Sequence, residues 1–138
     1  MTRVNENPTI TDSDAMTTYK TVNVNGIGIF YRKSGPKDAP VVLLLHGYPS
    51  SSRMFEPLLP CLGKHYRLIA PDFPGFGLSQ APDRSVFEYT FKHLARTMRE
   101  FTDVLGLPQY SLFMQDYGGP VGFRMALAPL LLEQPCGI

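Results

Sequence analysis

The chain has 138 residues, enough for one ordinary domain, and its composition (43% hydrophobic, 18% charged, 12% aromatic) is typical of a globular protein. Thirteen basic and twelve acidic residues leave a formal charge of +1, with no basic run that could follow a phosphate backbone, so nucleic acid is not an expected partner. The polar N-terminus lacks the apolar segment of a secretory signal, and VVLLL is too short to span a bilayer, so we expect a cytoplasmic protein without a membrane partner.

Residues 1–18 are predicted to form a flexible leader, followed by two β-rich runs in YKTVNVNGIGIFYRKSG. Asn25-Gly26 separates these runs and suits the positive φ angles of a tight turn, which predicts an antiparallel hairpin. Gly26-Ile27-Gly28 precedes a strand rather than opening a helix and lacks a third glycine, so no dinucleotide cofactor is expected. Cys61 and Cys136 have no zinc-type spacing and are interpreted as two reduced thiols, with no metal.

Three apolar runs are predicted to be buried strands of a parallel sheet: residues 40–47, 66–72 and 110–115. Helical segments alternate with them: a short helix interrupted by prolines in RMFEPLLPCLGK, an amphipathic helix in SVFEYTFKHLARTMREFTDVLG, and a core-facing helix in GPVGFRMALA. Pro129 is expected to end the last helix, which leaves residues 129–138 as an irregular tail. This alternation predicts an α/β fold over residues 19–128 with a doubly wound, mostly parallel sheet.

Three loops, HGYPSS, DFPGFGLS and QDYGG, follow the predicted parallel strands, at the sheet edge where ligands bind in such folds. Asp116 occupies the sharp turn between the last strand and its helix, so its carboxylate is a candidate nucleophile. Gly118 and Gly119 would let the helix approach closely, and free N–H groups at the helix start would hold developing negative charge. The alternative role for Asp116 is an N-cap of the following helix.

These three motifs, in this order and spacing, resemble the α/β-hydrolase fold over residues 19–128. An Asp in the nucleophile position further resembles the branch that contains epoxide hydrolases and haloalkane dehalogenases. The resemblance implies that Asp116 attacks a small epoxide or halogenated substrate and forms an alkyl ester. It also implies an oxyanion hole made by the backbone N–H groups of Tyr48 and Tyr117.

Other positions follow from the same resemblance. It implies a structural role for His46 and Gly47 in the oxyanion turn, and for residues 72–79 as a loop that frames the site. Met114, two residues before Asp116, departs from the small residue often found there. The HGYP loop and the absence of Trp favour epoxides over halides as substrates.

The resemblance also implies that an acid and a His follow the nucleophile, and this sequence does not provide that pair. Its three histidines all precede Asp116, and the only later carboxylate side chain is Glu133. We therefore expect an N-terminal part of a hydrolase, without its lid and later strands, that is inactive alone. The alternative is a truncated product with at most a binding role. The strand at 110–115 would then be an exposed edge, which predicts self-association.

Overall fold

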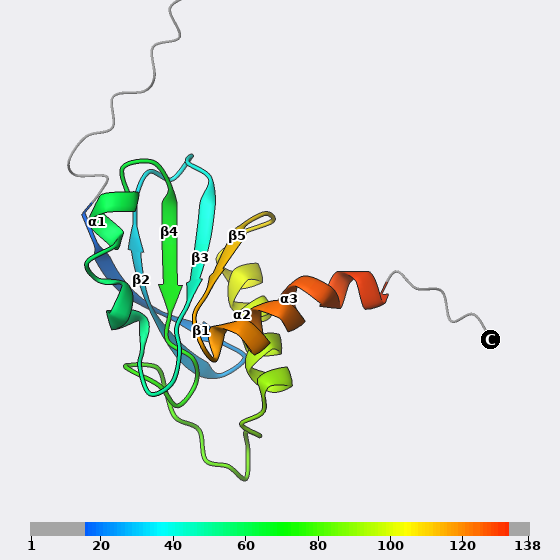
Figure 1. Ribbon diagram of the computed structural model, residues 1–138. Helices are drawn as coiled ribbons and strands as arrows, with labels where there is room; N and C mark the ends of the chain where they lie inside the picture. Colours follow the sequence, from blue (N-terminus) through cyan, green and yellow to red (C-terminus); the bar gives the residue numbers. More distant parts are fainter. Residues whose placement is uncertain (1–15, 133–138) are drawn as a thin grey trace, which may run out of the picture.

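The computed structural model describes residues 16–132, and of these the side chains up to Pro129 (Figure 1). The leader up to residue 15 and the tail from residue 133, with Glu133 and Cys136, lie outside the described residues. One sheet contains five strands in the order β1-β2-β4-β3-β5. The strands are β1 (Thr18–Val24), β2 (Ile27–Ser34), β3 (Val41–Leu45), β4 (Arg67–Pro71) and β5 (Ser111–Met114). The helices are η1 (Ser52–Phe55), a 3-10 turn, α1 (Leu59–Leu62), α2 (Phe91–Val104) and α3 (Gly118–Leu132).

The N-terminal hairpin forms as predicted. Strands β1 and β2 pair antiparallel from Thr18 opposite Lys33 to Val24 opposite Ile27. The turn residues Asn25 and Gly26 have φ angles of 48° and 86°, the left-handed region that Asn and Gly tolerate best.

The hairpin is attached to a parallel core. Strand β2 pairs antiparallel with β4, whereas β3 pairs parallel with both β4 and β5. The sheet is therefore mixed, and the predicted α/β class is confirmed. Because β4, β3 and β5 are parallel, their carboxyl ends meet at one edge of the sheet, where the three predicted loops emerge.

Two hydrophobic clusters cover the two faces of the sheet. Side chains of β3 alternate between them, with Leu43 and Leu45 facing α2 and α3, and Leu44 facing η1 and α1. Met98 of α2 and Val121 of α3 are fully buried on the first side, and Leu59 of α1 is fully buried on the second. Figure 1 shows α2 and α3 together on one side of the sheet, away from α1. This is the doubly wound arrangement that the sequence predicts.

Two helix boundaries differ from the sequence prediction. Helix α2 starts at Phe91 rather than near Ser85, because Thr90 caps it by accepting the His93 N–H at 3.1 Å. Helix α3 does not end before Pro129 but continues to Leu132. A proline inside a helix removes one backbone hydrogen bond, a limited loss so close to the C-terminal end.

Strand β5 is less buried than the sequence predicts. It lies at the sheet edge and, among the described residues, pairs only with β3. Its side chains alternate between exposed and half-buried, and Phe113 is 48% exposed. Between residues 16 and 132, no helix is both long and apolar enough to cross a membrane.

Candidate active site

A strained turn joins β5 to α3. Asp116 has a φ angle of 51°, a left-handed conformation that is uncommon for residues other than glycine. The Gln115 N–H extends the ladder to the Leu45 carbonyl at 3.1 Å, and the Gly118 N–H then closes a turn on the Gln115 carbonyl at 2.8 Å. The turn therefore lifts the exposed Asp116 side chain out of the sheet at the carboxyl end of β5.

Glycines make room for this turn, although not all of the predicted ones. A Cβ at Gly118 would lie 2.3 Å from the Leu45 carbonyl oxygen, so the close approach of α3 to β3 requires glycine there. A Cβ at Gly119 would meet nothing within 4 Å, so the expected packing role of Gly119 is wrong. Gly122 has that role instead, because its Cβ would lie 2.3 Å from the sulfur of Met114. The large side chain of Met114 thus packs where Gly122, one helical turn into α3, has no side chain.

The Asp116 carboxylate is held by a backbone donor from another loop. The Tyr48 N–H donates to Oδ2 of Asp116 at 2.9 Å. Gly47 permits this contact, because a Cβ on it would lie 2.5 Å from the Asp116 Cβ. The Tyr117 N–H makes no hydrogen bond within the described part of the chain, so it stays available at the start of α3. Of the two predicted oxyanion donors, the Tyr48 N–H therefore contacts the Asp116 carboxylate, and the Tyr117 N–H belongs to the next residue in the sequence.

Three aromatic side chains stand beside this carboxylate, and we call Tyr48, Phe76 and Tyr117 the aromatic wall. The rings of Tyr48 and Tyr117 stack with centroids 5.2 Å apart. Phe76 meets both rings edge-on at 6.3 Å, and Phe91 of α2 supports Tyr117 at 4.9 Å. Phe76 was not among the predicted site residues, although an aromatic residue in a Gly-rich loop after a parallel strand was a usable signal.

His46 is a buried structural residue rather than a free base. Its Nε2 accepts the Phe73 N–H at 3.1 Å, which leaves Nδ1, 2.9 Å from the Gly47 carbonyl, to carry the ring proton. Burial lowers the pKa of His46, and the Gly47 carbonyl and the charge of Asp72 oppose that shift. Both ring nitrogens are occupied in the neutral form, so His46 fastens the oxyanion turn to the next loop.

The other two histidines lie away from Asp116. His65 is exposed just before β4, at the amino end of the parallel strands, whereas Asp116 is at the carboxyl end. His93 is on α2, where its Nδ1 lies 2.9 Å from the Glu88 carbonyl and its ring stacks on Phe87. Neither histidine has a hydrogen bond to Asp116.

Asp72 links the two other loops of the site. Its buried carboxylate accepts the Ser52 N–H at 2.7 Å and the Leu78 N–H at 2.8 Å, one on each oxygen. Its carbonyl accepts the Ser79 hydroxyl at 2.7 Å. Gly77 packs directly on this carboxylate, since a Cβ there would lie 2.1 Å from Oδ2. The loop that starts at Asp72 is therefore a hydrogen-bonded frame joined to the turn at Ser52.

A buried cation fastens this frame to the hairpin. Arg32 of β2 is 8% exposed and donates to Glu56 at 2.7 Å and to the Ser52 hydroxyl at 2.5 Å. Tyr19 of β1 donates to the other oxygen of Glu56. This network was not predicted, because a lone Arg in a β-strand gives no sequence signal of its distant partners.

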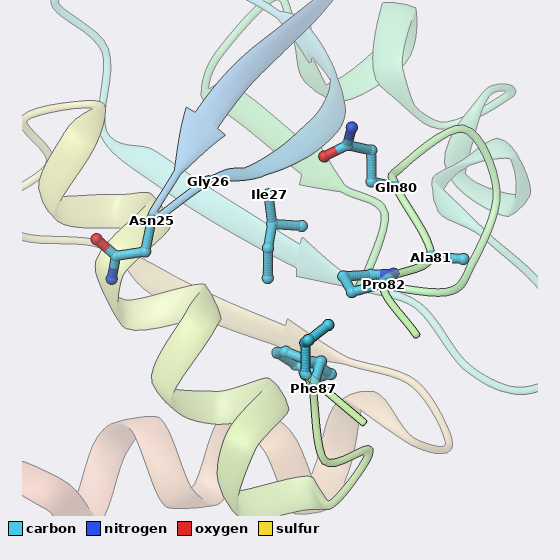
Figure 2. A pocket seen from close by; sticks show the side chains of 8 residues that line it. Asn25, Gly26, Ile27, Gln80, Ala81, Pro82 and Phe87 are labelled. Atoms are coloured by element: carbon cyan, nitrogen blue, oxygen red, sulfur yellow. The ribbon is translucent and has the colours of Figure 1, made fainter. Parts of the chain in front are cut away.

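A separate hollow of about 410 Å³ lies between the hairpin turn and the loop at residues 80–87 (Figure 2). Ile27 and Phe87 face the same space there. The lining contains no titratable side chain, so it offers no acid, base or nucleophile.

Comparison with known proteins places this geometry in a family. Residues 40–134 match the family described as alpha/beta hydrolase fold. An uncharacterized hydrolase of Saccharomyces cerevisiae is 40% identical over 103 residues, which cover 75% of this chain and 35% of that protein. A haloalkane dehalogenase of Psychrobacter cryohalolentis is 42% identical over 98 residues, which cover 70% of this chain and 32% of that protein.

A solved structure agrees with these matches. The epoxide hydrolase of Vigna radiata superposes with a TM-score of 0.73 at 36% identity, covering 80% of this chain and 36% of that structure. The chain spans about a third of the length of the curated relatives it matches. Since the family match covers well over half of the chain and falls on the loops that surround Asp116, the chain belongs to the α/β hydrolase fold family.

Proposed function

We propose that this chain carries the nucleophile of a hydrolase that opens epoxides or displaces halide at saturated carbon, with Asp116 as the attacking group. The observation that supports this most directly is the hydrogen bond from the Tyr48 N–H to Oδ2 of Asp116, in a left-handed strand-to-helix turn. An N-cap alone needs no such donor from a loop 68 residues away.

The hydrogen bond assigns different roles to the two carboxylate oxygens. Oδ1 accepts no hydrogen bond from the residues that the structure describes, so its electron pair is free to attack carbon. The new C–O bond forms as the bond to the epoxide oxygen or halide breaks. The epoxide alkoxide then takes a proton from water, whereas a halide leaves as the anion. The product of this step is an alkyl ester on Asp116.

The ester would then be hydrolysed at its carbonyl carbon. Oδ2 is now the carbonyl oxygen and already faces the Tyr48 N–H, so the charge that develops there on water attack meets an existing donor. The Tyr117 N–H would be the second donor. The attacking water needs a base, and the buried His46 has both ring nitrogens engaged. We therefore propose that this chain forms the ester and hydrolyses it slowly.

Epoxides are the favoured substrate class. The wall beside Asp116 offers phenol rings, and the sequence has no Trp to supply an indole N–H to a departing halide. Stacked rings suit the apolar body of either kind of substrate. The named relatives include both dehalogenases and an epoxide hydrolase.

Intact mass spectrometry after incubation with styrene oxide, and separately with bromohexane, tests the proposal. We expect one adduct per chain, equal in mass to the epoxide or to the bromoalkane less HBr, and located on Asp116 by peptide mapping. In water labelled with heavy oxygen, slow hydrolysis would leave little label in the Asp116 carboxylate.

The matched control is Asp103→Ala, because Asp103 is an exposed carboxylate on α2. That variant should form the same adduct, whereas Asp116→Ala should form none. Equal labelling of both variants would refute the nucleophile assignment. Rapid multiple turnover with label entering Asp116 would instead show that a base acts in this chain, and binding of substrate without any adduct would favour a purely binding role.

A further inference from the structure

A second concave surface lies between α2 and α3, outside the candidate active site. This groove has a volume of about 710 Å³, within the range of small-molecule sites. Its cationic lining residues are Lys92, Arg96, Arg99 and Arg124. The lining also contains Glu88, Thr90 and His93, and apolar atoms of Ala95, Leu127 and Ala128. A groove with both kinds of surface suits a ligand that has both a charged and an apolar part.

The lining of the groove has a larger positive charge than the whole chain. Four cations and one carboxylate, Glu88, give the lining a formal excess of three positive charges, whereas the entire chain has +1. Arg96 is partly compensated by Glu100 at 3.2 Å. Lys92 and Arg99 make no ion pair or side-chain hydrogen bond with any residue from 16 to 132. Two cations of this groove therefore lack a counter-charge in that part of the chain.

The placement of these cations opposes helix stability. Lys92, Arg96 and Arg99 are spaced by four and three residues, so they are neighbours on one face of α2 and repel each other. They start in the first turn, which has no acidic residue, at the helix end where the macrodipole favours negative charge. A surface on which like charges repel each other and carboxylates compensate only part of them is a candidate for binding an anion.

Arg124 completes the groove from the opposite helix. Its guanidinium lies 5.8 Å from the centre of the Phe91 ring and donates to the Pro120 carbonyl at 3.1 Å. These contacts fix its position and leave other N–H groups of the fork free. An Arg fork matches the geometry of an oxyanion, in particular a carboxylate or a phosphate group.

We propose that the groove between α2 and α3 binds a small amphipathic oxyanion, with its carboxylate or phosphate group held by cations of the lining and its apolar body along Leu127. The charge of the groove excludes cationic ligands, and its volume accommodates a medium-length alkyl chain. The lining of this groove shares no residue with the aromatic wall or the oxyanion turn.

Calorimetric titration of the full chain with octanoate tests this inference. We expect saturable one-site binding, at least about tenfold weaker binding of acetate, which lacks the apolar body, and weaker binding in high salt. Arg99→Gln and Arg124→Gln should each weaken octanoate binding about tenfold, because each removes one positive charge from the lining. Lys64→Gln, at an exposed lysine outside the groove, should leave binding unchanged.

Further measurements distinguish this groove from other ways in which the chain could bind octanoate. Asp116→Ala should bind octanoate like the unaltered chain, and amide shifts in NMR spectra should map to α2 and α3. Equal affinity for octyltrimethylammonium, or insensitivity to both Arg substitutions, would overturn the inference. Sedimentation of the chain with phosphatidylglycerol vesicles, without saturable octanoate binding, would also overturn it and identify the basic face as a membrane surface.

Discussion

Replacing Gly118 by Ala perturbs the contact that positions the turn at Asp116. The added Cβ would lie 2.3 Å from the Leu45 carbonyl oxygen and 2.9 Å from its carbon, and contacts below 3.0 Å are essentially never found. Both atoms belong to the backbone of the central strand β3, so α3 itself has to move by roughly 0.7 Å. Because α3 begins at Gly118, two residues after Asp116, this movement also displaces the carboxylate from the Tyr48 N–H.

The size of the effect follows from overpacking. Forcing extra atoms into a close contact costs about 1–3 kcal/mol in the free energy of unfolding. The adjacent Gly119 is a matched control, since its Cβ would meet nothing within 4 Å and its φ is not in the left-handed region. Gly119→Ala should be neutral or stabilise by up to about 1 kcal/mol, because alanine restricts the unfolded chain. The free energies of unfolding of the two variants should therefore differ by about 1–4 kcal/mol.

Urea unfolding followed by circular dichroism measures this difference. We expect the midpoint of Gly118→Ala to lie below that of the unaltered chain, and that of Gly119→Ala at or above it. The rate of adduct formation with styrene oxide should fall in the first variant only. Equal midpoints for the two variants would refute the claim that the contact with Leu45 controls this turn.

Three other predictions concern the rest of the molecule. Burial lowers the pKa of His46, so the unfolded chain, with the ordinary value of 6.5, binds more protons in acid. The contribution of His46 to the free energy of unfolding is therefore complete above pH 6.5. It is lost as pH falls, by at most about 1.4 kcal/mol per pH unit. In urea unfolding measured at several pH values, His46→Gln should remove this slope. Arg32→Met should lower the free energy of unfolding by about 1–2 kcal/mol, because Ser52 and the half-exposed Glu56 lose a donor. The chain should self-associate through the edge of β5, and Phe113→Lys should shift sedimentation velocity profiles toward the monomer.

Each of these has a clear contrary result. An unchanged pH slope in His46→Gln would mean that other groups cause the acid sensitivity. Arg96→Met is the control for Arg32, because the exposed pair of Arg96 with Glu100 should contribute less than about 0.5 kcal/mol. Equal losses in the two Arg variants would contradict the structural role of the buried network. An unaltered chain that sediments as a monomer at all concentrations would contradict the edge prediction.

Local chemistry was enough to predict several elements from the sequence. Asn25-Gly26 specifies the hairpin turn, and the aliphatic run before His46 specifies a central strand, because both signals lie within a few consecutive residues. The strand-to-helix turn around Asp116 was predictable for the same reason. The start of α2 was predicted too early, since the apolar Phe87 fits the helical period but lies in the preceding loop, before the Thr90 cap.

The tertiary structure decided which distant groups meet. Pairing of β3 with β5 in the register of Leu45 opposite Met114 brings the Tyr48 N–H to Asp116 across 68 residues of sequence. The same packing makes Gly122, rather than Gly119, the residue that accommodates Met114. It also joins Arg32 to the site loops through Ser52. The sequence by itself determined the elements and the strand-to-helix turn at Asp116, because propensities act over a few residues. Only the folded sheet determined the donors and supports around Asp116, because strand order and register bring together groups that no local pattern connects.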